Sequence, residues 1–425
     1  MTGGVSFGEF VSRAQHAGQL VVQPRMGMSS PGEMRAGLQA TMRARAVTVG
    51  TITLDSFTRV GDHHSARCAL RDGHPLNGYP IVAHDLATTA AVLDGLLENG
   101  FPVQVRHGSA DPSDIFTALM ATGLNATEGG PVSYCLPYSR RPLVDTVRIW
   151  ARCCERLADS SGPQAIPHVE TFGGCMMGQL CPPSLLIALS VLEGLFFRLH
   201  GLRSVSLSYA QQTNTEQDVE AISALRDIAG EVLPDIDWHV VVYAYMGVYP
   251  RSAPGALALL AEAAQLAVRA GAARLIVKTV AEAHRIPTIA ENVSALESAA
   301  AAATRSQRGQ PVSDTGIRDE ARSIIDAVLD LDPDLDRALV VAFQRGYLDV
   351  PYCLHPDNAG RTRSHIDDDG WLRWSRVGAL PIARPALRDD GLTSSGLLTA
   401  LSYVSRRFDM LESAARLPLA SPVQC

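Results

Sequence analysis

Lysine is almost absent from this chain of 425 residues, in which 36 of the 37 basic side chains are arginine and only Lys278 is lysine. A guanidinium can replace an ammonium wherever a site needs only a positive charge. A compact ammonium, however, does chemistry that a planar guanidinium cannot. The single lysine is therefore a candidate functional group, and its survival by chance is the alternative interpretation.

The chain also lacks the short motifs that mark several enzyme classes. Its eight cysteines include no C-x-x-C pair and its twelve histidines no H-E-x-x-H motif, so we expect no metal site and disfavour a metal-dependent hydrolase. Scattered, unpaired thiols are typical of a reduced, cytoplasmic protein. The net charge of −7 and the isoelectric point near 5.9 argue against nucleic acid or an anionic membrane as partner.

Long apolar runs are missing as well. The longest, Pro182 to Phe197, is interrupted by Ser184, Ser190, Glu193 and Gly194, so we predict a buried helix there rather than a membrane span. The first residues have no basic segment followed by an apolar one, so we expect no signal peptide and a cytoplasmic location.

A regular alternation of short apolar runs and helical patterns dominates residues 20–280. The apolar runs are Leu20 to Pro24, Val47 to Leu54, Tyr79 to Ala83, Phe101 to Arg106, Gly123 to Glu128, His168 to Phe172, Ser204 to Tyr209, Trp238 to Tyr243 and Arg274 to Thr279. The helical patterns between them are Pro31 to Arg45, Thr88 to Asn99, Ser113 to Thr122, Leu143 to Ala158, Pro183 to His200, Glu216 to Glu231 and Ala256 to Ala270. Strands that alternate with helices of this length indicate a parallel sheet, and eight such units close into a barrel.

The predicted fold is therefore α/β, with a (β/α)8 TIM-type barrel over residues 1–290 that begins with a short amphipathic helix. Residues 291–425 are predicted to form a helical and irregular C-terminal region packed on the barrel. Helical patterns run over Ala281 to Thr304 and Ile317 to Leu331, and the chain is irregular from Tyr347. Of the nine strand candidates, Tyr79 to Ala83 is the weakest because Pro80 lies inside it. A doubly wound open sheet is the alternative architecture, but no G-x-G-x-x-G follows the first strand.

Three arginines follow successive predicted strands. Arg25 comes after the first strand, Arg59 after the second, and Arg106 ends the next strong one. In a parallel barrel these positions meet at one end, where active sites lie. A single arginine at a strand end is usually a surface ion pair, but three converging cations favour a bound anion. Guanidinium groups grip carboxylates and phosphates bidentately, which suits a small dicarboxylate or a phosphate.

An acid and two tyrosines come from the following strand and turn. Glu128 precedes Gly129-Gly130, and either it is a structural counter-ion of the arginines or it accepts the ammonium group of an amino-acid substrate. Tyr134 and Tyr138 follow this turn. Buried tyrosines are commonly core residues with a backbone partner, but here hydrogen bonding to a substrate is an equal alternative.

Lys278 ends the last predicted barrel strand, with Glu282 four residues later. The simplest interpretation is an ion pair along one helical turn. The alternative is a Schiff-base amine, as found in some barrel aldolases. The residues alone leave both open.

Taken together, these motifs resemble the large subunit (E, or epsilon, chain) of adenosylcobalamin-dependent glutamate mutase, also called methylaspartate mutase. The matching segments run in order from about residue 20 to 380. They are 23–27, 58–59, 106–108, 128–130, 133–134, 137–138, 182–184, 277–279, 282, 286–288 and 358–360.

The resemblance implies a barrel that receives the adenosyl group of coenzyme B12 and an isomerase that interconverts L-glutamate and 3-methylaspartate by radical fragmentation and recombination. It assigns Arg25, Arg59 and Arg106 to the substrate carboxylates and Glu128 to the substrate ammonium. It further implies the roles of the remaining site residues: substrate hydrogen bonding by Tyr134 and Tyr138, and contact with the cofactor by Lys278, Glu282 and Asn358.

The resemblance also implies a partner. Cobalamin would sit mainly on a separate small subunit with a D-x-H-x-x-G motif, and two copies of this chain would form a homodimer within a heterotetramer. Asp237-Trp238-His239 begins that motif here, but Val242 replaces its glycine inside a predicted strand, so we interpret it as a false match. The segment Phe172 to Met177 departs from the family pattern.

Three other functions stay open. One is a mutase of the same family acting on a related dicarboxylate such as 2-oxoglutarate. Another is a Schiff-base lyase using Lys278. The third is a dicarboxylate-binding scaffold without catalysis.

Overall fold

The computed structural model describes residues 6–160, 166–172, 180–307, 309, 313–383 and 393–415. The departing segment Phe172 to Met177 thus lies outside the described residues from position 173 onward. The main sheet has eight strands: β1 Val21–Gln23, β2 Gly50–Thr53, β3 Val103–Arg106, β4 Ala126–Glu128, β5 His168–Glu170, β6 Ser204–Ala210, β7 Asp237–Tyr243 and β8 Arg274–Ile276.

All neighbouring strands of this sheet run parallel, in the order β1-β8-β7-β6-β5-β4-β3-β2. The two edge strands approach each other through a bridge between Val22 and Thr48, and the Val22 N–H donates to the Val47 carbonyl at 2.9 Å. The ring of strands is nearly closed. This arrangement confirms the predicted TIM-type barrel over the open-sheet alternative.

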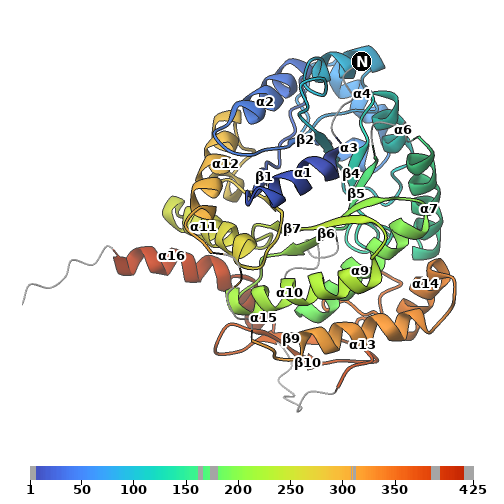
Figure 1. Ribbon diagram of the computed structural model, residues 1–425, viewed down its shortest axis with the longest axis vertical. Coiled ribbons are helices and arrows are strands. Elements are labelled where there is room, and N and C mark those ends of the chain that lie inside the picture. Colours follow the sequence, from blue (N-terminus) through green and yellow to red (C-terminus); the bar gives the residue numbers. More distant parts are fainter. Residues whose placement is uncertain are drawn as a thin grey trace, which may run out of the picture.

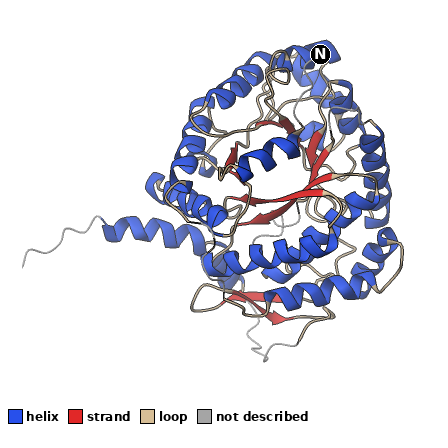
Figure 2. Cartoon of the chain, viewed as in Figure 1, coloured by secondary structure: helices blue, strands red, loops and turns tan. Residues whose placement is uncertain are grey.

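Helices surround the strands on the outside (Figures 1 and 2). They are α2 Pro31–Arg43, α3 Ser56–Arg59, α4 His63–Arg71, α5 Leu86–Leu93, α6 Ser113–Ala121, α7 Leu143–Asp159, α9 Pro183–Leu199, α10 Thr215–Val232, α11 Ala253–Arg269, the 3-10 helix η1 Val280–Ala283, and α12 Ile289–Ala303. Six of the seven predicted helical segments between the strands are confirmed, with small shifts at their ends. The segment predicted over Thr88 to Asn99 is helical only as far as Leu93, where α5 ends, and continues as turns.

Local sequence signals explain where several elements begin. Ser30 caps α2 by accepting the Glu33 N–H at 3.4 Å, and Pro31 occupies the first helical turn. The region Ala281 to Thr304, predicted as one helix, is instead split into η1 and α12. Thr288 and Glu291 form a capping box that starts the second helix. The weak candidate Tyr79 to Ala83 is not a strand and makes only a single bridge to Leu54.

The helix α1 Phe7–His16 lies across one opening of the barrel (Figure 1). A Cβ added at Gly8 would lie 2.2 Å from the Ser204 hydroxyl, at the first residue of β6. The Phe7 ring lies 4.9 Å from the Arg274 guanidinium carbon at the start of β8. Because these residues begin their strands, α1 closes the amino-terminal end, and the opposite end remains for the site.

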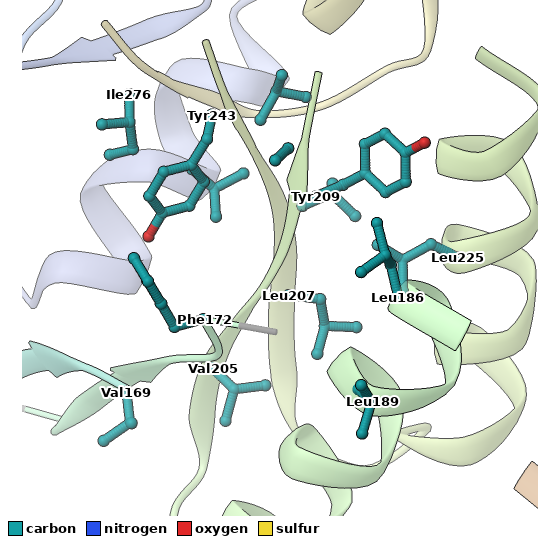
Figure 3. Close-up of a cluster of buried hydrophobic side chains, with 14 of the residues drawn as sticks. Val169, Phe172, Leu186, Leu189, Val205, Leu207, Tyr209, Leu225, Tyr243 and Ile276 are labelled. Atoms are coloured by element: carbon teal, nitrogen blue, oxygen red, sulfur yellow. The ribbon is translucent and has the colours of Figure 1, made fainter. Parts of the chain in front are cut away.

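The hydrophobic core lies between the strands and the outer helices. Figure 3 shows Leu207 and Tyr209 of β6 beside α9 and α10, whereas Tyr243 of β7 projects from the other side of the sheet. All three side chains are fully buried. The alternation along each strand thus sends one set of side chains to the helices and the other into the barrel.

The C-terminal region packs on the barrel. It contains α13 Ile317–Leu329, α14 Leu335–Arg345, the antiparallel hairpin β9 Arg363–Ile366 and β10 Leu372–Arg376, α15 Ser394–Leu401 and α16 Tyr403–Ala415. Because α12 packs against α11 and α2 in the ring of helices, we propose that the barrel continues through α12, slightly beyond the predicted boundary at residue 290.

The apolar segment after Pro182 forms α9, and most of this helix is fully buried under α10 and α13. The prediction of a buried helix is confirmed. None of the helices in the described ranges has the length and apolar character needed to cross a membrane.

His200 links three elements and provides a pH-dependent test of the fold. Its ring bonds to Glu155 of α7 at 3.1 Å and to Asp336 of α14 at 3.0 Å. Burial alone would lower the pKa of His200, but the two carboxylates outweigh it and raise the pKa. A raised folded-state pKa means that this contribution to stability is complete below about pH 6.5, the unfolded value, and is lost as the pH rises through the folded value.

We therefore expect His200→Gln to lower the free energy of unfolding more at pH 5.5 than at pH 8.5, as measured by urea unfolding. The exposed His16 of α1 supplies the control His16→Gln, which should show no such difference. Equal destabilisation by His200→Gln at both pH values would contradict the ion-pair assignment.

Candidate functional site

The candidate site begins at Arg106, the last residue of β3. Its guanidinium is buried and forms salt bridges with Glu128 at the end of β4 and, at 3.1 Å, with Glu170 at the end of β5. The Tyr243 hydroxyl of β7 lies 2.9 Å from the same guanidinium. Four strands thus converge on one cation inside the barrel, as the position at the carboxyl ends predicts.

Glu128 has a second partner. The Tyr134 hydroxyl donates a hydrogen bond to its carboxylate, so the predicted acid and one predicted tyrosine lie together. Burial raises the pKa of the Glu128 carboxyl to about 7, and the charge of Glu170 adds to this rise while Arg106 opposes it. Near neutral pH this carboxyl can therefore hold or release a proton, or accept a cation.

The turn after Glu128 is held by a buried acid from another helix. One carboxylate oxygen of Glu193 in α9 accepts the backbone N–H groups of Val132 at 3.0 Å and Ser133 at 2.8 Å. Gly130 packs so closely that an added Cβ would lie 2.1 Å from this carboxylate, and Gly129 has φ +122°. Only glycine fits both positions, and the turn thereby delivers Tyr134 to Glu128.

Two important residues of the interior were missed by the sequence analysis. Glu170 and Arg274 are fully buried and pair with each other, and the Tyr243 hydroxyl also donates to Glu170. Burial opposes the charge on Glu170, but Arg274 and Arg106 outweigh it and lower its pKa. A glutamate inside the apolar run His168 to Phe172 was the available signal, because an unpaired charge is seldom buried.

Arg25, Glu282 and Lys278 form a second group at the same end of the barrel. The Arg25 guanidinium lies 2.6 Å from the Glu282 carboxylate, which also accepts the Thr279 N–H at 3.0 Å. The Lys278 ammonium lies 4.3 Å from the ring centre of Tyr249. Burial and the nearby Arg25 charge lower the pKa of Lys278 to about 8, against the opposing effect of Glu282.

Arg59 and Tyr138 lie at the outer rim. Both line a cleft of about 510 Å³ together with Gly108, where an added Cβ would lie 3.5 Å from the Arg59 side chain. Within the described part of the chain, Arg59 makes no salt bridge or side-chain hydrogen bond. Tyr138 is 48% exposed, and its ring contacts that of Tyr134 edge-on, with ring centres 5.7 Å apart.

Asn358 does not join this group through any contact in the described residues. Its side-chain oxygen accepts the Val350 N–H at 2.8 Å, and its NH2 group donates to the carbonyls of Val350 at 3.0 Å and Cys353 at 3.2 Å. These bonds close its own loop. Contact between Asn358 and a cofactor stays a prediction.

His239 lies inside β7, fully engaged in the barrel interior. Its ring stacks on that of His168, with centres 5.2 Å apart, and Arg274 approaches it at 3.4 Å. This position supports the interpretation of Asp237-Trp238-His239 as a false match to the cobalamin-binding motif.

The charges of the site do not cancel. The cations are Arg25, Arg59, Arg106, Arg274 and Lys278, and the carboxylates are Glu128, Glu170 and Glu282. When all eight groups are ionised, two positive charges remain in excess, and protonation of Glu128 would add a third. Such an excess of positive charge favours an anionic ligand.

Comparison with known proteins gives a consistent result. Residues 4–390 match the family model described as methylaspartate mutase E chain. The chain is 29% identical to a glutamate mutase epsilon subunit from Escherichia coli O157:H7 over 394 residues, covering 88% of this chain and 81% of that protein. It is 31% identical to a glutamate mutase epsilon subunit from Halobacterium salinarum over 388 residues, covering 88% of this chain and 80% of that protein.

Proposed function

The chain belongs to the methylaspartate mutase E chain family, and from this premise we propose that it is the substrate-binding subunit of an adenosylcobalamin-dependent mutase. Its reaction would be the isomerisation of L-glutamate to 3-methylaspartate and back, by radical fragmentation and recombination. The observation that carries the proposal is the excess of positive charge around a buried guanidinium at the carboxyl end of the barrel. An amino dicarboxylate, with a net charge of −1, complements it.

The residues divide the substrate between them. Arg106 and Arg59 would bind carboxylate groups through their forked N–H donors, with Arg25 completing the set. Glu128 would accept the substrate ammonium, and the Tyr134 hydroxyl would fix the orientation of this carboxylate. Tyr138 would contact the substrate from the rim. The nearly closed barrel would exclude water and keep a reactive fragment in place.

The residues present also fit an adenosyl group. Glu282 offers carboxylate oxygens to ribose hydroxyls, and Lys278 lies beside it. At the end of β6, the side-chain NH2 of Gln211 is buried and has no hydrogen-bond partner in the described residues, so a bound ligand could use this donor. When bound, the cofactor would supply the cobalt–carbon bond homolysis that the protein residues cannot perform.

Exposed apolar side chains support a partner at this end of the barrel. Four of them lie in the segments that follow β2, β4, β7 and β8, namely Val60, Tyr138, Val248 and Ile286. The fifth is Leu354 in a C-terminal loop, whose carbonyl accepts a hydrogen bond from Arg140. We propose that a small cobalamin-binding subunit covers them and that two copies of this chain pair within a heterotetramer. Covering such residues removes apolar surface from water.

The lowered pKa of Lys278 favours a second candidate function, that of a Schiff-base lyase. A lysine with a pKa of about 8 is partly neutral at neutral pH, as a Schiff-base amine must be. Borohydride trapping without cobalamin would label Lys278 if the protein were a Schiff-base lyase. Since Lys278 is the only lysine, the mass of one peptide decides the question.

The proposal is tested by supplying this chain with a small cobalamin-binding subunit of the family and adenosylcobalamin. L-Glutamate and 2-oxoglutarate are then compared as substrates, with products identified by proton NMR. We expect 3-methylaspartate from L-glutamate only. Turnover of 2-oxoglutarate alone would overturn the role of Glu128, and tight binding of both without turnover would indicate a non-catalytic scaffold.

A further inference from the structure

The helix α16 lies beyond residues 4–390, the part of the chain that matches the family. It packs against α11 and extends away from the body of the molecule (Figure 1). The face of α16 toward the barrel is apolar. Val404 and Phe408 are buried in a small separate cluster with Tyr245, Tyr249 and Leu259. Tyr245 and Tyr249 belong to the loop between β7 and α11.

Polar contacts fasten α16 to the same loop. The Asp409 carboxylate accepts the backbone N–H groups of Arg251 at 3.1 Å and Ser252 at 3.0 Å, and the Ser252 hydroxyl at 2.7 Å. Because Ser252 caps the N-terminus of α11, Asp409 holds the point where the loop ends and the helix begins. Two turns of α16 thus contact residues 245–252 through apolar packing and through hydrogen bonds.

This loop carries the aromatic ring that holds Lys278. The Tyr249 ring is buried, and the Lys278 ammonium lies 4.3 Å from its centre, within the range of a cation–π interaction. Phe408 and Tyr249 belong to the same buried cluster, and the Tyr249 ring covers Lys278. The cluster thus lies between an element outside the family match and a residue of the candidate site.

We propose that α16 is a positioning element for Lys278, with Phe408 and Asp409 acting through Tyr249 to fix the location and burial of the ammonium group. The inference rests on the proposed function only for the catalytic meaning of Lys278. The physical coupling itself can be measured on this chain without cofactor or partner.

Within the described residues, three groups act on the ammonium, and they set the direction of the expected change. Arg25 from the loop after β1 disfavours its charge, Glu282 from η1 favours it, and Tyr249 covers it. Burial is the largest influence and keeps the pKa at about 8. Loosening the loop would admit water and move the pKa up, towards the value of about 10.4 for a free lysine.

The test uses the single lysine. The full chain is treated with a trace amount of acetic anhydride between pH 6 and 11, and acetylation of Lys278 is followed by peptide mass spectrometry. For Phe408→Ala and for Asp409→Ala we expect the midpoint of the pH profile to rise by about one unit and the limiting rate to increase. The control is Met410→Ala, because Met410 lies on the same helix but is 65% exposed.

A double substitution distinguishes an effect of α16 on Lys278 through Tyr249 from a general loosening of the fold. Tyr249→Leu removes the ring through which α16 is proposed to act, so adding Phe408→Ala to it should cause little further change in the Lys278 midpoint. Circular dichroism confirms that each variant is folded, and Asp409→Ala replaces Phe408→Ala if the latter is not. Profiles that match the Met410→Ala control, or fully additive shifts, would overturn the proposal. Neither outcome depends on mutase activity, so a failure here and a failure of the proposed function are distinguishable.

Discussion

Replacing Arg106 with lysine is expected to lower kcat/KM for L-glutamate by about 100-fold or more, although the formal charge is unchanged. The guanidinium reaches Glu128, Glu170 and the Tyr243 hydroxyl at once, from three different strands. An ammonium is a point charge on a flexible stem and cannot hold these partners while also gripping a substrate carboxylate bidentately. A loss of 100-fold corresponds to about 2.7 kcal/mol of transition-state stabilisation.

The matched control for this variant is Arg148→Lys. Arg148 lies on α7 with 71% of its side chain exposed, so the same chemical change there should leave the kinetics unaltered. Both variants are assayed with the partner subunit and cofactor, and their thermal unfolding is compared with that of the original chain. A folded Arg106→Lys protein with unchanged kcat/KM would refute the assignment of Arg106 to the substrate.

The second large effect is expected on stability. Glu170→Leu should lower the free energy of unfolding by about 3–5 kcal/mol, because it leaves the fully buried Arg274 and the buried Arg106 without their shared carboxylate. Denaturant unfolding at pH 7 measures this loss. The lowered pKa of Glu170 means that its contribution is present above about pH 4.3 and is lost as the pH falls through the folded-state value.

The double variant Glu170→Leu/Arg274→Leu tests the physical reason. Removing both buried charges should restore much of the stability lost in the single variant, because an apolar pair needs no charge compensation. If the single variant lost less than about 1 kcal/mol, or if the double variant were the less stable of the two, then Glu170 would not be the counter-ion that holds the interior together.

Much of the fold was accessible from the sequence because it depends on local patterns. Apolar runs that alternate with helical periods identified the eight strands, and Pro80 marked the candidate to be discarded. The one helix predicted over Ala281 to Thr304 was wrong because the Thr288 capping box begins a new helix inside it. The helix α14 was missed within a region that the sequence analysis left unassigned after residue 331.

The pairing of the site residues could not be predicted in the same way. Sequence position placed Arg25, Arg59 and Arg106 at strand ends, but it did not identify the residues with which they pair. Arg25 pairs with Glu282, Arg106 pairs with Glu128 and Glu170, and Arg59 lies at the rim by Gly108. Which carboxylate meets which guanidinium depends on the barrel register and on which way each side chain turns.

The sequence by itself therefore determined the barrel, the family and the end of the strands where charged residues gather, since these follow from periodicity and from short motifs. Only the tertiary structure decided that Glu170 and Arg274 neutralise part of the interior, that Glu193 anchors the turn carrying Tyr134, and that Phe408 of α16 is buried in one cluster with Tyr249, beside Lys278. These contacts join residues far apart in the chain, whose proximity is created by closing the barrel and packing helices around it.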